Sequence, residues 1–157
     1  MGLTKSYSII GFIITLLLSF IVASNIESYR HPDSVNFLRE SLLESLEIQK
    51  ENSSNPTLED TFDKFIIDLE NNLTEIKYKK LSLIRIIGCV VALFGGIFLR
   101  QKIKLGLHLF LGGNLFVLIA SFYFLGFGLS GWVINFSYLI FATISTVYFI
   151  RKRAYLN

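Results

Sequence analysis

Residues 57–99 read TLEDTFDKFIIDLENNLTEIKYKKLSLIRIIGCVVALFGGIFL and join a charged segment to an apolar one. The first part repeats apolar residues at spacings of three or four, the stripe of an amphipathic helix: Leu58, Phe62, Ile66, Leu69, Leu73 and Ile76. Residues 81–99 are apolar all round except for Ser82 and Arg85, which is typical of a membrane span. With Thr57 as the cap and no internal proline, the stretch predicts one unbroken helix of about 60 Å, roughly half of it outside the bilayer.

Three further apolar runs predict three further spans, at residues 7–23, 105–125 and 132–150. The first run fits either a retained signal anchor or a cleaved signal peptide. We favour the anchor, because the run is long for a signal peptide and further spans follow it.

The polar region between the first two spans predicts a pair of helices. Residues 34–51 carry an apolar stripe at helical spacing, residues 52–56 have the composition of a turn, and residues 58–80 carry the second stripe. Two such helices cover each other's stripes when they fold back as an antiparallel hairpin. The prediction is therefore an all-α, polytopic membrane protein with four transmembrane helices. Its parts are a first span (1–23), an extramembrane acidic helical hairpin (24–80), three further spans (81–150) and a basic tail (151–157).

The charges are segregated along the chain. All twelve carboxylates lie between Glu27 and Glu75, and residues 24–80 hold them with only seven bases. Such an acidic region repels phosphates, so we expect no nucleic-acid partner. Short basic segments flank the other ends of the spans and favour a cell-membrane protein with cytoplasmic termini and an outward hairpin: Lys5, Arg100, Lys102, Lys104, Arg151, Lys152 and Arg153. The bases of the hairpin oppose this orientation, but the positive-inside rule is strongest for short segments beside the spans.

Metal, disulfide and nucleophile motifs are missing from the sequence. Cys89 is the only cysteine, so no disulfide forms within the chain. The two histidines lie in different regions and cannot join a Cys/His metal cluster. We therefore expect no metal, no cofactor and no enzymatic activity.

Arg85 is the sharpest anomaly, because a guanidinium in hydrocarbon is costly unless it reaches water or a partner. It either snorkels to the outer interface or joins a polar cluster with Tyr123 and Asn135, which lie at similar depth in the third and fourth spans.

Two more polar residues lie within the third span. His108 is close to the inner end of the span, where we expect an interfacial role. Asn114 is nearer the middle, where we expect a hydrogen bond to a neighbouring helix, with Thr15 or Thr143 at comparable depth.

Gly88, Ala92 and Gly96 recur every four residues along one face of the second span. Small residues allow helix backbones to approach closely in lipid. The face predicts packing on another span of the same chain or, alternatively, self-association.

Gly128-Leu129-Ser130-Gly131 resembles the G-x-S-G motif of rhomboid intramembrane proteases over four residues. Rhomboids pair this serine with a histidine at matching depth, whereas here His108 lies at the opposite end of its span. We interpret Ser130 as the turn residue and N-cap before Trp132.

These observations predict a non-enzymatic membrane protein that presents its hairpin outside the cytoplasm. The partner would be a second copy of the chain or another membrane or envelope protein. The alternative is a small transporter or channel subunit with a polar cluster around Arg85, Asn114 and Asn135.

Overall fold

A computed structural model describes the backbone of residues 2–53 and 55–151, and the side chains of residues 9–53 and 55–151. Within these ranges the regular structure is helical throughout: α1 (Gly2–Arg30), α2 (Ser34–Glu51), α3 (Pro56–Asn72), α4 (Glu75–Arg100), α5 (Leu105–Leu125) and α6 (Leu129–Arg151). Helices α1, α4, α5 and α6 are long and apolar enough to cross a membrane. The expected all-α class with four apolar helices is confirmed, and it suggests a multi-pass membrane protein.

Helices α4 and α5 form the tightest pair in the bundle because glycines line both sides of their contact. A Cβ atom on Gly95 would lie 2.4 Å from the backbone nitrogen of Phe110, and one on Gly113 would lie 2.6 Å from that of Ala92. The two backbones therefore touch without intervening side chains, as small residues permit between helices in lipid. Helix α1 packs on α4, and α6 packs more loosely on α5.

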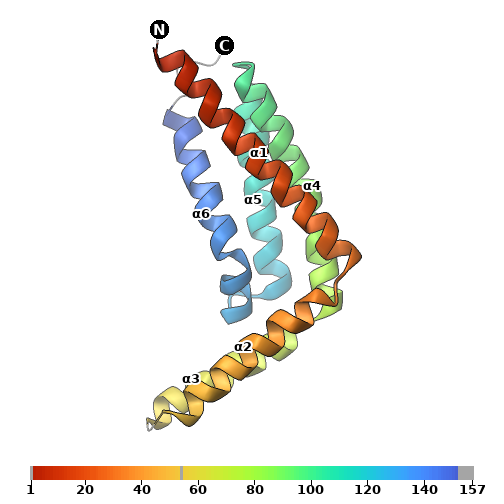
Figure 1. The fold of residues 1–157 in the computed structure, drawn as a ribbon, viewed down its shortest axis with the longest axis vertical. Coiled ribbons are helices and arrows are strands. Elements are labelled where there is room, and N and C mark those ends of the chain that lie inside the picture. The colour runs from red at the N-terminus through yellow and green to blue at the C-terminus, as the bar shows by residue number, and fades with distance from the viewer. Residues whose placement is uncertain (1, 54, 152–157) are drawn as a thin grey trace.

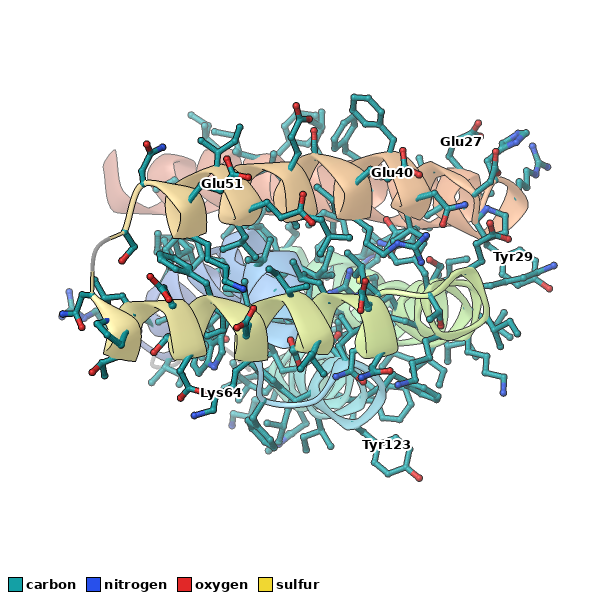
Figure 2. All side chains as sticks on the ribbon, turned by 90° about the horizontal axis from the view of Figure 1, so that it is seen from below. Glu27, Tyr29, Glu40, Glu51, Lys64 and Tyr123 are labelled. Carbon is teal, nitrogen blue, oxygen red and sulfur yellow. The ribbon has the colours of Figure 1, made fainter. Side chains whose placement is uncertain are left out.

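Helices α2 and α3 lie side by side and slant across one end of the bundle (Figures 1 and 2). Their facing apolar side chains merge with the neighbouring ends of α4 and α5 into one buried cluster: Val35, Leu69, Leu73, Leu81 and Leu125. The pair is thus held by packing to the same helix ends that it covers. The beginning of α1, the α4–α5 connection and the end of α6 lie together at the opposite end (Figure 1).

The prediction of one unbroken helix over residues 57–99 is wrong. Helix α3 ends at Asn72, Leu73 leaves helical geometry at φ −95° and ψ 61°, and α4 begins at Glu75. Thr74 caps the new helix, its side chain accepting a hydrogen bond from the backbone nitrogen of Lys77. The apolar stripe did not indicate this break, because Leu73 keeps its position in the stripe and is fully buried at the corner. Helix α4 alone is roughly 39 Å long.

Other helix ends also differ from expectation. Asn55, not Thr57, caps α3, since its side chain accepts a hydrogen bond from the backbone nitrogen of Thr57 at 3.0 Å. Helix α1 continues through the expected polar connector as far as Arg30. Helix α6 begins at Leu129, ahead of the expected start. Continuing a helix keeps backbone groups paired, and this favours longer helices than hydropathy alone indicates.

Candidate functional site

Arg85 of α4 lies at a junction of three helices near the hairpin end of the bundle. Its Nε donates a hydrogen bond to Oγ of Ser121 on α5, at 3.1 Å. One terminal nitrogen, Nη2, donates to the carbonyl oxygen of Ile134 at 3.4 Å and to Oδ1 of Asn135, both on α6. The guanidinium is thus fixed inside the bundle by α5 and α6. Of the two interpretations of Arg85, this geometry is that of a polar cluster.

Asn135 is oriented for this contact by a bond of its own. Its Nδ2 donates to the carbonyl oxygen of Gly131 at 2.7 Å, one turn earlier in α6. The amide therefore turns its oxygen, the only part that can accept a hydrogen bond, toward Arg85. Asn135 is fully buried, so loss of either bond would leave a polar atom without water.

A second polar contact lies deeper in the bundle, between α5 and α6. The hydroxyl of Tyr138 donates to Oδ1 of Asn114 at 2.7 Å, and Nδ2 of Asn114 donates to the carbonyl oxygen of Phe110 at 2.8 Å. The thiol of Cys89 on α4 lies 3.8 Å from the same hydroxyl. Asn114 therefore bonds a neighbouring helix as expected, but through Tyr138 rather than Thr15 or Thr143.

Arg85 forms no ion pair with a carboxylate in the part of the chain that the structure describes. The sequence contains no Asp or Glu after Glu75. Among the described residues, no hydrogen bond reaches the other terminal nitrogen of Arg85, Nη1, which carries two N–H groups. The side chain also lines a cavity of about 270 Å³ between α1, α4 and α6, together with Ser24, Ser137 and Tyr138. The Arg85 guanidinium thus borders this cavity and has N–H groups that no described residue accepts from.

The structure leaves two of the sequence candidates away from this cluster. The side chain of Tyr123 is 82% exposed and points away from the bundle (Figure 2). His108 is exposed on the outer surface of α5. Tyr123 lies at a depth similar to that of Arg85, but its side chain is on the outer side of α5 and not on the side that faces Arg85.

The small residues of α4 divide between two neighbours. Gly88 and Ala92 face α5, where a Cβ on Gly88 would lie 2.5 Å from Val117. Gly96 instead faces α1, where a Cβ on its backbone would lie 3.4 Å from Oγ1 of Thr15. Both contacts are between helices of the same chain.

Ser121, Cys89 and Tyr138 take part in the polar contacts and were missed in the sequence. Ser121 offered a signal, since it lies two residues before Tyr123 and at the depth of Arg85. Tyr138 offered a weaker one, as a tyrosine well inside the fourth apolar run. Buried tyrosine hydroxyls usually find a partner.

The hairpin contacts the bundle through Asp68 of α3. One carboxylate oxygen, Oδ2, accepts from the backbone nitrogen of Ser130 and lies at hydrogen-bond distance from its hydroxyl, both at 2.8 Å. Ser130 lies inside α6, so the interpretation of this residue as an N-cap is wrong. Asp68 instead supplies the acceptor that the helix start needs, from a different helix.

An ion pair between α2 and α3 lies near the tip of the hairpin. The ammonium group of Lys50 donates to Asp63, and the side chains border a cavity of about 540 Å³ with Glu47, Glu51 and Glu59. The hydrogen bond from Lys50 to Asp63, helped by the charges of the nearby carboxylates, raises the pKa of Lys50 above its ordinary value.

Comparison of the chain with protein-family models, with curated proteins and with solved structures finds no match. Within residues 9–53 and 55–151, no group of three or more His, Cys, Asp or Glu side chains could hold a metal ion. The residues themselves, and their geometry, are therefore the basis for a functional proposal.

Proposed function

We propose that this chain is a non-enzymatic, multi-pass membrane protein that presents the α2–α3 hairpin outside the cytoplasm and acts by binding another membrane or envelope protein. One observation carries the proposal: the hairpin is fixed to the bundle while apolar residues on its outer side stay uncovered. The basic residues at the opposite bundle end favour the outward orientation of the hairpin.

Several contacts hold the hairpin in one position. Besides the Asp68–Ser130 bonds, the amide of Asn36 on α2 donates to Glu75 at the start of α4. The hydroxyl groups of Ser28 on α1 and Tyr78 on α4 lie 3.3 Å apart, and this contact joins the two helices that lead into and out of the hairpin. A surface fixed in this way loses little conformational freedom when it binds, which favours recognition.

One uncovered face lies along α2. Phe37 is 78% exposed and Ile48 is 52% exposed. They are eleven residues apart, which brings them to nearly the same side of a helix. Acidic residues surround them, and Glu40 and Glu51 extend from the same helix (Figure 2). A partner with apolar sockets and a basic rim fits this face better than a second acidic hairpin does.

A site-specific photo-cross-linking experiment in the native membrane tests the proposal. A cross-linking amino acid is introduced at Phe37 or Ile48, and Lys64, exposed on α3, is the matched control. We expect one discrete cross-linked product from the α2 positions and much less from Lys64. Equal products from all three positions, or a bare monomer throughout, would contradict partner binding through α2.

The alternative function, a small transporter or channel subunit, is favoured by one observation. Arg85, Asn114 and Asn135 all contribute to polar contacts between helices of the bundle. Arg85 on α4 bonds Asn135 on α6, and Asn114 on α5 bonds Tyr138 on α6. Ion flux in liposomes that is lost in Asn114→Leu and retained in Phe116→Leu, on the outer surface of α5, would support this role over partner binding.

A further inference from the structure

A groove runs between α1 and α6. These two helices are not among the closely packed pairs of the bundle, and α1 leans across α4 instead (Figure 1). Two cavities lie between them, one of about 270 Å³ toward the hairpin and one of about 440 Å³ toward the other end. Phe141 lines both, so the two cavities follow one another along α1 and α6, on either side of this side chain, and we refer to them as the two halves of the α1–α6 groove.

The half toward the hairpin combines apolar side chains with polar ones and a positive charge, and we call it the polar half. Arg85 lines it with an Nη1 group that no described residue accepts from, and with no carboxylate beside it. Ser24 and Ser137 are exposed and add hydroxyl groups. A planar guanidinium with free N–H groups is suited to a phosphate. Other hydrogen bonds hold it to Ser121 and Asn135, so it is already oriented.

The other half is apolar. Its walls are Ile10, Ile13, Ile14 and Leu17 of α1, and Ile144 and Tyr148 of α6. From Asn25 in the polar half to Ile10 in the apolar half, α1 covers about 22 Å, more than the roughly 15 Å of hydrocarbon in one leaflet. The two cavities together therefore extend over at least the length of a hydrocarbon chain in one leaflet.

The polar half also lies at the right depth for a lipid headgroup. Ser121, which Arg85 contacts, is four residues before the end of α5, or about 6 Å along the helix. A charge there is near the boundary between hydrocarbon and headgroups, within reach of a phosphate. A charge in hydrocarbon without any counter-ion is costly, and an anionic headgroup offsets part of that cost.

We propose that the α1–α6 groove binds one anionic phospholipid of the surrounding bilayer, with its phosphate on Arg85 and a hydrocarbon chain between α1 and α6. The site is separate from the outer face of α2, so its failure would leave the proposed partner binding intact. Charge complementarity selects the headgroup, and the apolar half selects a membrane lipid over a free anion.

Native mass spectrometry of the full chain, delipidated in mild detergent and titrated with phosphatidylglycerol, tests this site. We expect one lipid to bind more tightly than the rest, and phosphatidylcholine to bind less tightly. Arg85→Gln keeps hydrogen-bond donors without the charge, and should weaken the first binding step about tenfold or more. Arg85→Lys should retain most of the affinity. Inorganic phosphate should not compete, because it leaves the apolar half empty.

A second pair of variants keeps the test valid if Arg85 variants fold poorly. Ile144→Trp fills the apolar half, whereas Ile119→Trp alters an outer surface of α5; the two isoleucines are 66% and 61% exposed. We expect loss of the tight lipid in Ile144→Trp alone. Equal binding in both would mean ordinary surface lipid and would overturn the proposal, as would equal affinities for Arg85→Gln and Arg85→Lys.

Discussion

Asp68 of α3 and Ser130 of α6 are 62 residues apart, and the carboxylate accepts from the backbone nitrogen of Ser130 at 2.8 Å. The start of a helix carries backbone N–H groups without partners and a partial positive charge. A negative side chain from another helix satisfies both. This contact therefore joins the hairpin to the bundle at a point where α6 would otherwise lack an acceptor.

Asp68→Ala should destabilise the protein by about 1.5–3 kcal/mol, the usual worth of hydrogen bonds to a charged group. The matched control is Asp60→Ala, which removes an exposed ion pair with Lys64 on the same helix. Such a pair is worth about 0.5 kcal/mol or less. Thermal unfolding in detergent measures both variants. Equal shifts in the melting temperature would mean that the Asp68 contact does not hold the hairpin.

Gly128→Ala should be destabilising because of Asp68. A Cβ on Gly128 would lie 2.1 Å from the Asp68 carboxylate, so the side chain would have to leave Ser130. In Asp68→Ala that obstacle is gone, and the same glycine substitution should cost much less. A double-mutant cycle measures the coupling, which we expect at about 1 kcal/mol or more. Additive effects would show that the two residues do not interact.

The neighbouring glycines Gly112 and Gly113 should respond in opposite ways to alanine. A Cβ on Gly113 would lie 2.6 Å from backbone atoms of α4, whereas one on Gly112 would have no atom of the described residues within 4 Å. Gly113→Ala should therefore cost about 1–3 kcal/mol by forcing α4 and α5 apart. Gly112→Ala should be neutral or slightly stabilising. Unfolding midpoints in a single detergent compare the two directly.

Asn135→Leu should cost about 1.5–3 kcal/mol, because Arg85 loses a charge-assisted hydrogen bond inside the bundle. Phe136→Leu, one residue later and 59% exposed, is the control for a change of shape on α6. Thermal unfolding distinguishes them. A neutral Asn135→Leu variant would mean that Arg85 reaches solvent in the folded protein.

Asp63→Asn should lower the pKa of Lys50, because the hydrogen bond and the charge of Asp63 are what raise it. A lysine whose pKa is raised on folding stabilises the folded state below its unfolded pKa, and this contribution is lost as the pH rises through the folded value. The α2–α3 tip should therefore loosen as the pH rises through the folded-state pKa of Lys50. NMR titration of labelled lysine Cε atoms gives the pKa. An unchanged value would rule out the Asp63 contact.

Composition and periodicity were enough to predict the helices, and they located α5 with the bounds that it has. They could not predict the corner after α3, because Leu73 keeps its place in the apolar stripe while the backbone turns. A local signal was present, since Thr74 is a capping residue followed by an acid in the first turn. Unbroken apolar spacing outweighed it.

The sequence was enough to predict how deep each polar residue lies along its span, but not which side of the helix it faces. Matching positions along the spans brought Arg85 and Asn135 together correctly. The same reasoning placed Tyr123 with them, but its side chain faces outward. The Asp68 contact had no signal in the sequence at all, because it depends on how the hairpin slants across the bundle.

Because the hairpin slants across the bundle, its tip lies far from its contact with α6. Asp68 is twelve residues from Pro56, so about 18 Å of α3 overhangs the contact with α6. Two residues in the first turns of α6 link α3 to the Arg85 guanidinium: Ser130 bonds Asp68 of α3, and Asn135, five residues later, bonds Arg85. A force applied to the tip would therefore reach the start of α6, where Ile134 also lines the α1–α6 groove.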